Sequence, residues 1–449
     1  MSSSTPIYKL STEILLHIAK MVPTASLPAL CRVSKELQPI AEEALYRYLV
    51  ISSNATSACD PIFRLLKRVV EQPRLAKSVK SLTTLDIYQN SSKFQDDLLL
   101  SILQIIDKRF ASSEQGATWR ARAEEGHELA FVAVLLAALP NIRSLDIALL
   151  NVSDLIELPS LLRSLGTYTH QPSSKTYDMF QSVTNLSVGC SGVGLLSCSF
   201  PKLKTLKITQ LNTLDMDNFM DEVVFFNRFS YDDLSRSTKN LEQLVIELPY
   251  GFRDIYWNNW TESLSPWVSE LALTHVPHLI VTFCYISPHE YELITFQYLV
   301  DMIHEVFPSI SKLTIPDDSY FSMDFMDIVE PIMCMPHFHH LRELEVSIEV
   351  LAGHNLGDYE KESLPAGLRK LAVCCFQMCH LERFGAWLDT FKDAETTKGL
   401  EDLVIWAENY QNIEEIQGWV DKFYGNLGFR VKVTHCEYRG TTGPWILHT

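Results

Sequence analysis

The sequence predicts an α/β fold in which short parallel strands and helices alternate along an open solenoid. A six-residue pattern (apolar, polar, polar, Leu, any residue, apolar) recurs ten times along the chain. Segments with the helical spacing of apolar residues lie between the copies. A unit of one strand and one helix cannot bury its apolar face alone, so we expect successive units to stack.

The ten copies are predicted to form strands whose Leu and terminal apolar side chains turn inward. They lie at 82–87, 142–147, 183–188, 203–208, 241–246, 268–273, 310–315, 341–346, 368–373 and 400–405, and residues 429–433 are a candidate last strand. Helices are predicted at 97–110, 128–139, 217–226, 291–307 and 413–427. The interval from Leu85 to Leu145 is the longest between successive copies, and we expect it to contain a degenerate unit.

The pattern resembles that of leucine-rich repeats, whose usual period is about 20–29 residues. Intervals between successive fourth-position Leu residues are unequal and mostly longer than that period, so the resemblance implies an irregular horseshoe. It also implies that the third and fifth positions of each copy face a concave surface. The alternative fold is a doubly wound α/β sheet, but its near-continuous apolar strands and Gly-rich phosphate turn are not found.

Residues 7–50 are predicted to form three short helices. Ser11 is placed to cap the first helix, Glu13 lies in its first turn, where the helix dipole favours an anion, and Pro23 ends it. A helical segment of about 45 residues buries too little apolar surface to be stable alone. We therefore expect these helices to pack against the rest of the chain, against another protein, or against both.

This segment resembles an F-box, and in particular those of fungal F-box proteins. The resemblance rests on LSTEILLHI at 10–18, LPALCRVSK at 27–35 and ALYR at 44–47, about a tenth of the chain. Members of that family dock on a small SKP adaptor, which links them to a cullin and a ubiquitin-conjugating enzyme. Ser11 stands where the family commonly has Pro, and Leu37 and Tyr46 stand where Trp is frequent. These departures leave open whether adaptor binding is weakened.

The resemblance implies a set of apolar adaptor contacts, some of which must instead hold the helices together. They are Leu10, Ile14, Leu15, Ile18, Leu27, Leu30, Val33 and Leu37. It further implies a non-catalytic function in protein ubiquitination, as the substrate-recognition subunit of an SCF-type ubiquitin ligase. The alternative is a non-catalytic leucine-rich-repeat scaffold whose N-terminal helices only cap the solenoid.

On this interpretation the chain has four segments. They are an F-box-like helical motif at 7–50, a helical linker at 51–80, a leucine-rich-repeat-like domain at 81–435 and a C-terminal tail at 436–449. The repeat domain would display a protein client, whose identity the sequence does not reveal.

Client binding is predicted at an aromatic insertion in the repeat domain. Its candidate contacts are Tyr250, Phe252, Tyr256, Trp257, Trp260 and Trp267. Aromatic side chains are among those most enriched at binding hot spots. The alternative is that these rings fill the groove between irregular repeats.

Charge and cysteine content limit the classes of partner and the compartment. The chain has 38 Lys and Arg against 55 Asp and Glu, a net charge of −17. Such a chain repels phosphate backbones and anionic lipid, so we expect neither a nucleic-acid nor a membrane partner. The N-terminus does not read as a secretory signal, and the 10 Cys have irregular gaps. The sequence therefore favours a reduced protein of the cytoplasm or nucleus.

Motifs typical of catalysis are not found in the sequence. It contains no Gly-x-x-x-x-Gly-Lys-Ser/Thr loop, no His-Glu-x-x-His helix and no Gly-x-Ser-x-Gly elbow. Cys374, Cys375, Cys379 and His380 cluster in sequence, but without a Cys-x-x-Cys pair we interpret them as core residues. We expect no enzymatic activity, no metal and no cofactor.

Overall fold

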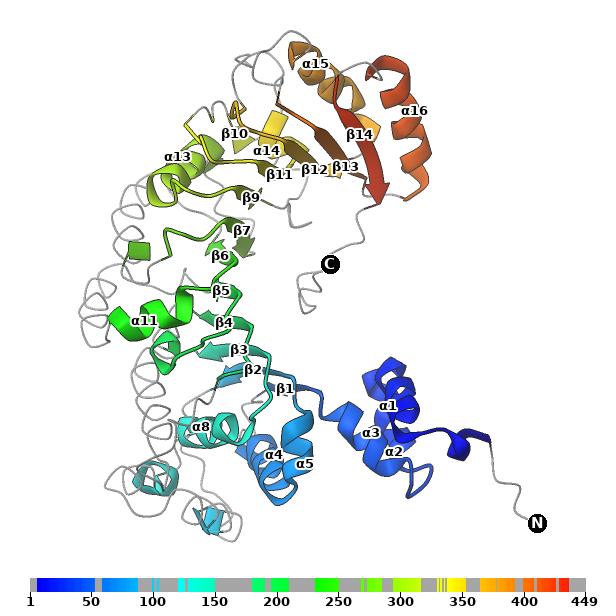
Figure 1. Cartoon of the computed structure of the whole chain (residues 1–449), viewed down its shortest axis with the longest axis vertical. Coiled ribbons are helices and arrows are strands. Elements are labelled where there is room, and N and C mark those ends of the chain that lie inside the picture. Colours follow the sequence, from blue (N-terminus) through cyan, green and yellow to red (C-terminus); the bar gives the residue numbers. More distant parts are fainter. Residues whose placement is uncertain are drawn as a thin grey trace. The chain divides into compact units, whose positions relative to one another are not determined.

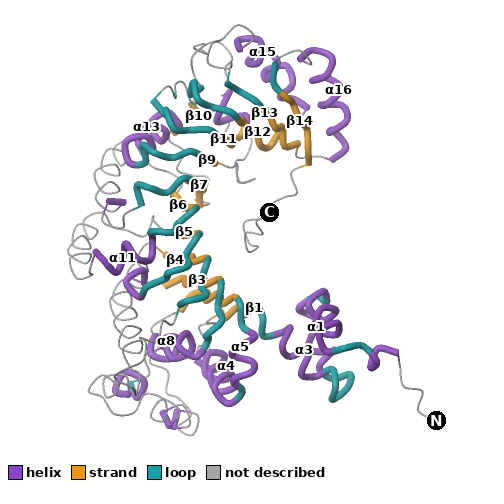
Figure 2. Tube along the Cα trace, viewed as in Figure 1, coloured by secondary structure: helices purple, strands orange, loops and turns teal. Residues whose placement is uncertain are grey.

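The computed structural model describes residues 6–52, 59–87, 99–100, 103–104, 120–125, 128–149, 180–189, 195–209, 231–249, 268–269, 273–284, 294–315, 329–330, 332, 335, 337–352, 364–376, 378–391, 399–407, 410–424 and 428–435. Figure 2 shows strands, loops and helices alternating along much of the chain. The predicted α/β class with parallel strands is confirmed.

Twelve strands form one open parallel sheet, in the order β1-β2-β3-β4-β5-β6-β7-β9-β11-β12-β13-β14. They are β1 (Tyr48–Ser52), β2 (Ser81–Ile87), β3 (Ser144–Leu149), β4 (Asn185–Gly189), β5 (Thr205–Thr209), β6 (Gln243–Pro249), β7 (His278–Cys284), β9 (Lys312–Ile315), β11 (Glu343–Ser347), β12 (Lys370–Phe376), β13 (Asp402–Ala407) and β14 (Arg430–His435). A separate two-stranded sheet pairs β8 (Ile294–Thr295) with β10 (Val329–Glu330). The order of the described strands follows the chain without the reversal that defines a doubly wound sheet.

The described helices lie before the sheet and between its strands. They are α1 (Thr12–Met21), α2 (Leu27–Cys31), α3 (Gln38–Leu45), α4 (Cys59–Glu71), α5 (Pro73–Ser78), α8 (Glu128–Ala138), α11 (Tyr231–Thr238), α13 (Phe296–Val306), α14 (Ile348–Ala352), α15 (Leu381–Phe391) and α16 (Ile413–Tyr424). Short 3₁₀ turns lie at Pro6–Lys9, Thr24–Ser26, Met378–His380 and Tyr410–Asn412. The chain divides into two compact units: unit 1 comprises 1–206 and 224–240, and unit 2 comprises 207–223 and 241–449.

Three of the helices predicted between the strands are confirmed. The segments 128–139, 291–307 and 413–427 contain α8, α13 and α16. The predicted helix at 97–110 lies largely outside the described residues, and the one at 217–226 lies wholly outside them.

Eight of the ten predicted copies coincide with strands and bury their fourth-position Leu, and the predicted last strand is β14. The prediction of a strand at 268–273 is wrong. Val268 and Ser269 are helical, and the next strand of the sheet is β7, at His278–Cys284. Leu279 of β7 pairs with Leu244 on one side and Leu313 on the other. The pattern missed β7 because Pro277 stands at a position where the pattern requires a polar residue. The strand still forms, because Pro is accommodated at the start of a strand.

The predicted register of the first copy is also wrong. Leu82, not Leu85, pairs with Leu145 of β3. Thr84 consequently takes an apolar position, where its side chain is buried and its hydroxyl donates to the Asp146 carbonyl at 3.4 Å. The pattern selected Leu85 because Ile87 supplies its apolar sixth position, whereas Thr84 stands at that position when Leu82 is the fourth residue. Strand β2 pairs directly with β3, so the degenerate unit expected between them adds no strand to this sheet. The strand that the pattern did not predict is β1, which pairs with the other side of β2.

In unit 2 the core is built from side chains at two alternating strand positions. The fourth-position residues are Leu244, Leu279, Leu313, Leu344, Leu371 and Leu403, and all are buried. Residues two places later, such as Ile246 and Ile405, are buried on the same face, as the two-residue period of a strand requires. Helix α13 adds Phe296, Leu299, Val300 and Ile303, and α16 packs against β14.

In unit 1 an all-apolar helix contributes much of the core. Residues 130–136 of α8 are all buried, as expected of a helix that is apolar all round. Helix α4 packs against α8 and buries Ile62, Leu66 and Val69, which share one face at spacings of four and three. The Phe180 and Phe200 rings stack at 4.6 Å between centroids.

A ladder of backbone hydrogen bonds joins the residues that precede successive strands. The Arg47 carbonyl accepts from the backbone N–H groups of Lys80 (2.9 Å) and Ser81 (3.1 Å). The Lys80 carbonyl accepts in the same way from Arg143 (2.8 Å) and Ser144 (3.0 Å). We call the residue before each strand its entry position, because it fixes the register of the next strand along the sheet.

Candidate functional site

The first helix begins as its sequence predicts. The Ser11 hydroxyl accepts from the Ile14 backbone N–H at 3.5 Å, which caps the N-terminus of α1. Hydrogen bonds from the backbone and from Ser11 lower the pKa of the Glu13 carboxyl. This carboxylate lies in the first turn, where the helix dipole favours a negative charge.

Helices α1, α2 and α3, here called the N-terminal module, share a small core of their own. The buried residues of this core are Ala19, Leu27, Leu37, Ile40 and Ala44, with Leu15, Leu16, Val22, Leu30 and Leu45 packed partly against it. Of the eight predicted adaptor contacts, Leu27 and Leu37 therefore hold the module together. Leu15 and Leu30 divide their surface between this core and solvent.

The other four predicted contacts lie on the surface of the module. Leu10 is 38% exposed, Ile14 48%, Ile18 39% and Val33 63%. Ile14 and Ile18 lie on one face of α1 because residues four apart are neighbours on a helix. Met21, 75% exposed, continues that face one turn on. The predicted set omitted Met21, although its spacing of seven from Ile14 placed it there.

The N-terminal module is joined to the sheet through α3. Figure 1 shows α1, α2 and α3 beyond β1, at the start of unit 1. The largely buried Glu42 carboxylate on α3 binds the guanidinium groups of Arg68 (3.1 Å) and Arg74 (3.5 Å) from α4 and α5. Gln38 also donates its side-chain amide to Glu42, at 3.0 Å. The boundary predicted after residue 50 falls inside β1, which follows α3 directly.

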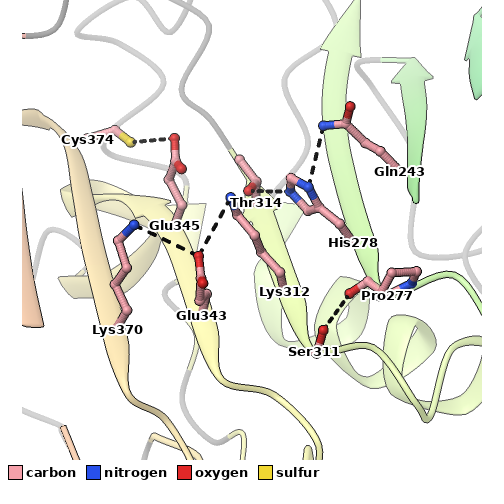
Figure 3. Close-up of polar contacts among 10 residues, drawn as sticks. All are labelled: Gln243, Pro277, His278, Ser311, Lys312, Thr314, Glu343, Glu345, Lys370 and Cys374. Atoms are coloured by element: carbon pink, nitrogen blue, oxygen red, sulfur yellow. Dashed lines mark hydrogen bonds and ion pairs between the residues drawn. The ribbon is translucent and has the colours of Figure 1, made fainter. Parts of the chain in front are cut away.

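The opposite face of the strands in unit 2 carries polar side chains at the third positions of the repeated pattern. Figure 3 shows them reaching from strand to strand. The Glu343 carboxylate lies 3.7 Å from the Lys312 ammonium and 3.9 Å from that of Lys370. Farther along, Arg430 makes two contacts with the Asp402 carboxylate, at 2.8 and 3.0 Å. Positive and negative side chains thus occur together from β9 to β14, and neighbours partly neutralise one another.

A histidine on β7 takes part in a relay of hydrogen bonds across three strands (Figure 3). His278 Nδ1 lies 3.4 Å from the Gln243 amide nitrogen, and its Nε2 lies 3.1 Å from the Thr314 hydroxyl. Burial, followed by the charge of Lys312, lowers the pKa of His278 to about 3. The imidazole is therefore neutral at physiological pH, with the Gln243 amide donating to Nδ1 and Nε2–H donating to Thr314. The sequence prediction missed His278 because it placed the strand at 268–273.

The predicted client contacts Tyr250, Phe252, Tyr256, Trp257, Trp260 and Trp267 all lie outside the described residues. The proposed client loop therefore remains a prediction. The described strands nearest to it in sequence are β6 and β7, which pair in register along their whole lengths.

The described part of the cysteine and histidine cluster packs inside unit 2. The Cys374 side chain is buried, and its thiol donates to the Glu345 carboxylate at 3.7 Å. His380 is buried, and its ring lies nearly perpendicular to that of Phe376. No group of three or more His, Cys, Asp or Glu among the described residues is arranged to hold a metal ion.

No protein-family model matches the sequence, and no curated protein matches it significantly. Among the described helices, none is long and apolar enough by itself to cross a bilayer. The helical pair Thr12–Met21 and Thr24–Cys31 passes that test jointly, by length and composition, but bends by 118° at its break.

Proposed function

We propose that this chain is the substrate-recognition subunit of an SCF-type ubiquitin ligase. Its N-terminal module binds a SKP-type adaptor, and through it a cullin, while its repeat domain holds a protein client. The chain makes and breaks no bond itself. Its contribution to ubiquitination is proximity, because it holds a client lysine near a charged ubiquitin-conjugating enzyme.

The exposed apolar surface of the N-terminal module carries this proposal. Ile14, Ile18 and Met21 follow one another along α1, and Val33 is exposed just after α2. Each such side chain gains about 1.5–3 kcal/mol on full burial, before the cost of association is subtracted. The module has a core of only five buried residues, and apolar side chains left in water add nothing to its stability. A bound adaptor would cover them.

The polar face of unit 2 supports the second half of the proposal. Its charged side chains are paired across strands, which presents an ordered surface of mixed sign. Such a surface discriminates among partners because a mismatched like charge costs binding energy.

Co-expression with a SKP-type adaptor tests the proposal. The wild-type chain should co-purify with the adaptor in equal amounts, and Ile14→Asp should release it because a carboxylate would be buried without a partner. The matched control is Tyr298→Asp on α13, a comparably exposed side chain far along the sequence, and this variant should retain the adaptor. Leu30 is a poorer choice because it packs partly against the module core.

The alternative function is a scaffold in which the N-terminal module caps the solenoid. The ion pairs from Glu42 to Arg68 and Arg74 favour it, since they tie α3 to α4 and α5. A cap has no need of an adaptor. A wild-type chain that purifies alone and stably in the presence of excess adaptor would support the scaffold and contradict the proposal.

A further inference from the structure

Three cations occupy equivalent entry positions on neighbouring strands of unit 1. Arg47, Lys80 and Arg143 precede β1, β2 and β3, and the backbone ladder joins them in that order. Adjacent strands lie about 4.8 Å apart, so these positions bring three like charges close together. Like charges on directly opposed residues destabilise a sheet. We call these three residues the cationic row.

Within the described residues, no carboxylate forms an ion pair with the cationic row. The Arg47 guanidinium donates to the Tyr48 hydroxyl at 3.1 Å and lies 5.5 Å from the centre of the Tyr48 ring. The Lys80 ammonium donates to the Lys77 carbonyl at 3.5 Å. The exposed Arg143 side chain has no carboxylate partner in the described part of the chain. In the described part of the chain, the three positive charges of the row are therefore not neutralised by a carboxylate.

The surroundings of Lys80 are electropositive. Burial, then the charges of Arg143 and Arg47, lower the pKa of Lys80, and Lys20 on α1 adds to the effect. Glu43 on α3 opposes it in part. The positive charge thus continues from the cationic row toward the N-terminal module.

Entry positions in unit 2 show that the chain can neutralise such cations. Arg369 forms an ion pair with Glu401 at the next entry position, at 3.8 Å. Among the described residues, the cationic row lacks an equivalent of Glu401, although the chain as a whole is rich in carboxylates.

Charge is unevenly distributed along the sequence. Residues 1–149, which include the whole cationic row, contain 17 Lys and Arg against 15 Asp and Glu, a net charge of +2, whereas the rest of the chain carries −19. A long polyanion such as DNA would be repelled by that larger negative part. A short acidic segment could contact the positive end alone.

We propose that Arg47, Lys80 and Arg143 bind an acidic peptide segment of a protein partner. Arg side chains suit this role because a guanidinium can bind a carboxylate through two parallel hydrogen bonds. The binding goes beyond the proposed function, since it requires neither the adaptor nor a ligase. Its benefit offsets the repulsion that the bare row imposes on the sheet.

Fluorescence anisotropy with a labelled Glu-rich peptide and the full chain tests the proposal. Wild-type protein should bind the peptide, and added salt should weaken binding. Lys80→Gln and Arg143→Gln should each weaken it roughly fivefold, since each removes one close charge pair. The matched control is Arg369→Gln. This variant also loses a positive charge at an entry position, but that charge already forms an ion pair with Glu401. Its affinity should stay within about twofold of wild type.

Thermal unfolding separates binding from a structural role. Lys80→Gln removes like-charge repulsion, so its melting temperature should equal or exceed that of wild type while peptide affinity falls. A lower melting temperature for both Lys80→Gln and Arg143→Gln would assign the row a structural role and overturn the proposal. Three other results would also overturn the proposal. They are absence of peptide binding, an equal loss of peptide affinity in Arg369→Gln, and equally tight binding of a single-stranded oligonucleotide of the same charge.

Discussion

Large apolar side chains are buried in the strands of unit 2, whereas several in the N-terminal module are exposed to solvent. Leu313, Leu344 and Leu371 are at most 1% exposed, whereas Ile14 and Val33 are 48% and 63% exposed. In the sheet, each of these Leu side chains lies between the fourth-position residues of two neighbouring strands. In the module, three short helices share one small core, which leaves part of their apolar surface in solvent. Repetition gives apolar side chains a partner within the chain, and a single small module does not.

The largest expected effect on stability comes from truncating a buried Leu of the sheet, and its absence would contradict this comparison. Leu371→Ala should lower the free energy of unfolding by about 2–5 kcal/mol, because it removes a fully buried side chain and leaves a cavity. Ile18→Ala should change it by less than about 0.5 kcal/mol, because that side chain is already partly in solvent. Urea unfolding followed by circular dichroism measures both. Equal losses would show that the exposed face of α1 is packed within the isolated chain.

The same contrast explains how far the sequence could predict the fold. Strands such as β11 and β13 were predicted in register because Leu344 and Leu403 each lie in an unambiguous pattern of polar and apolar positions. Strand β7 was missed because Pro277 broke that pattern, and β2 was misregistered because Thr84 broke the pattern around Leu82 while Leu85 fitted it. Local patterns cannot settle such cases, since pairing with neighbouring strands decides them.

Prediction of the candidate site was limited in a different way. The sequence identified the apolar residues of α1 and α2 but could not assign Leu27 to the core and Ile14 to the surface, because both fit a helical stripe. That assignment depends on how the three helices cross. The cationic row was not anticipated either, because Lys80 and Arg143 are far apart in the sequence and become neighbours only through the sheet.

A smaller effect concerns the polar face of unit 2 and its dependence on pH. The pKa of His278 is lowered to about 3 in the folded chain, against an ordinary value near 6.5. Below pH 6.5 the unfolded chain binds a proton that the folded chain does not, so acidification should reduce stability. The contribution is at most about 1.4 kcal/mol per pH unit, and solvent near the ring reduces it. Well above pH 6.5 this group should contribute no pH dependence.

A matched variant isolates that contribution from other titrating groups. His278→Gln keeps a hydrogen-bonding side chain between Gln243 and Thr314 but cannot titrate. Urea midpoints measured from neutral pH down to about pH 5 should fall less steeply for His278→Gln than for wild type. Parallel curves would mean that His278 has the same pKa in the folded and unfolded chains, and that burial does not hold it neutral in the relay across β6, β7 and β9.

The smallest expected effect concerns the exposed end of the same face. Arg430 is largely exposed where it meets Asp402, so Asp402→Asn should cost only about 0.2–1 kcal/mol, and less at high salt. The loss should be smaller than that of Leu371→Ala even though the pair has close, two-point geometry. Water can solvate both partners once they separate, whereas it cannot fill an apolar cavity favourably. A loss as large as that of Leu371→Ala at both salt concentrations would mean that pairing across the polar face, and not the repeated Leu core, holds adjacent strands of unit 2 together.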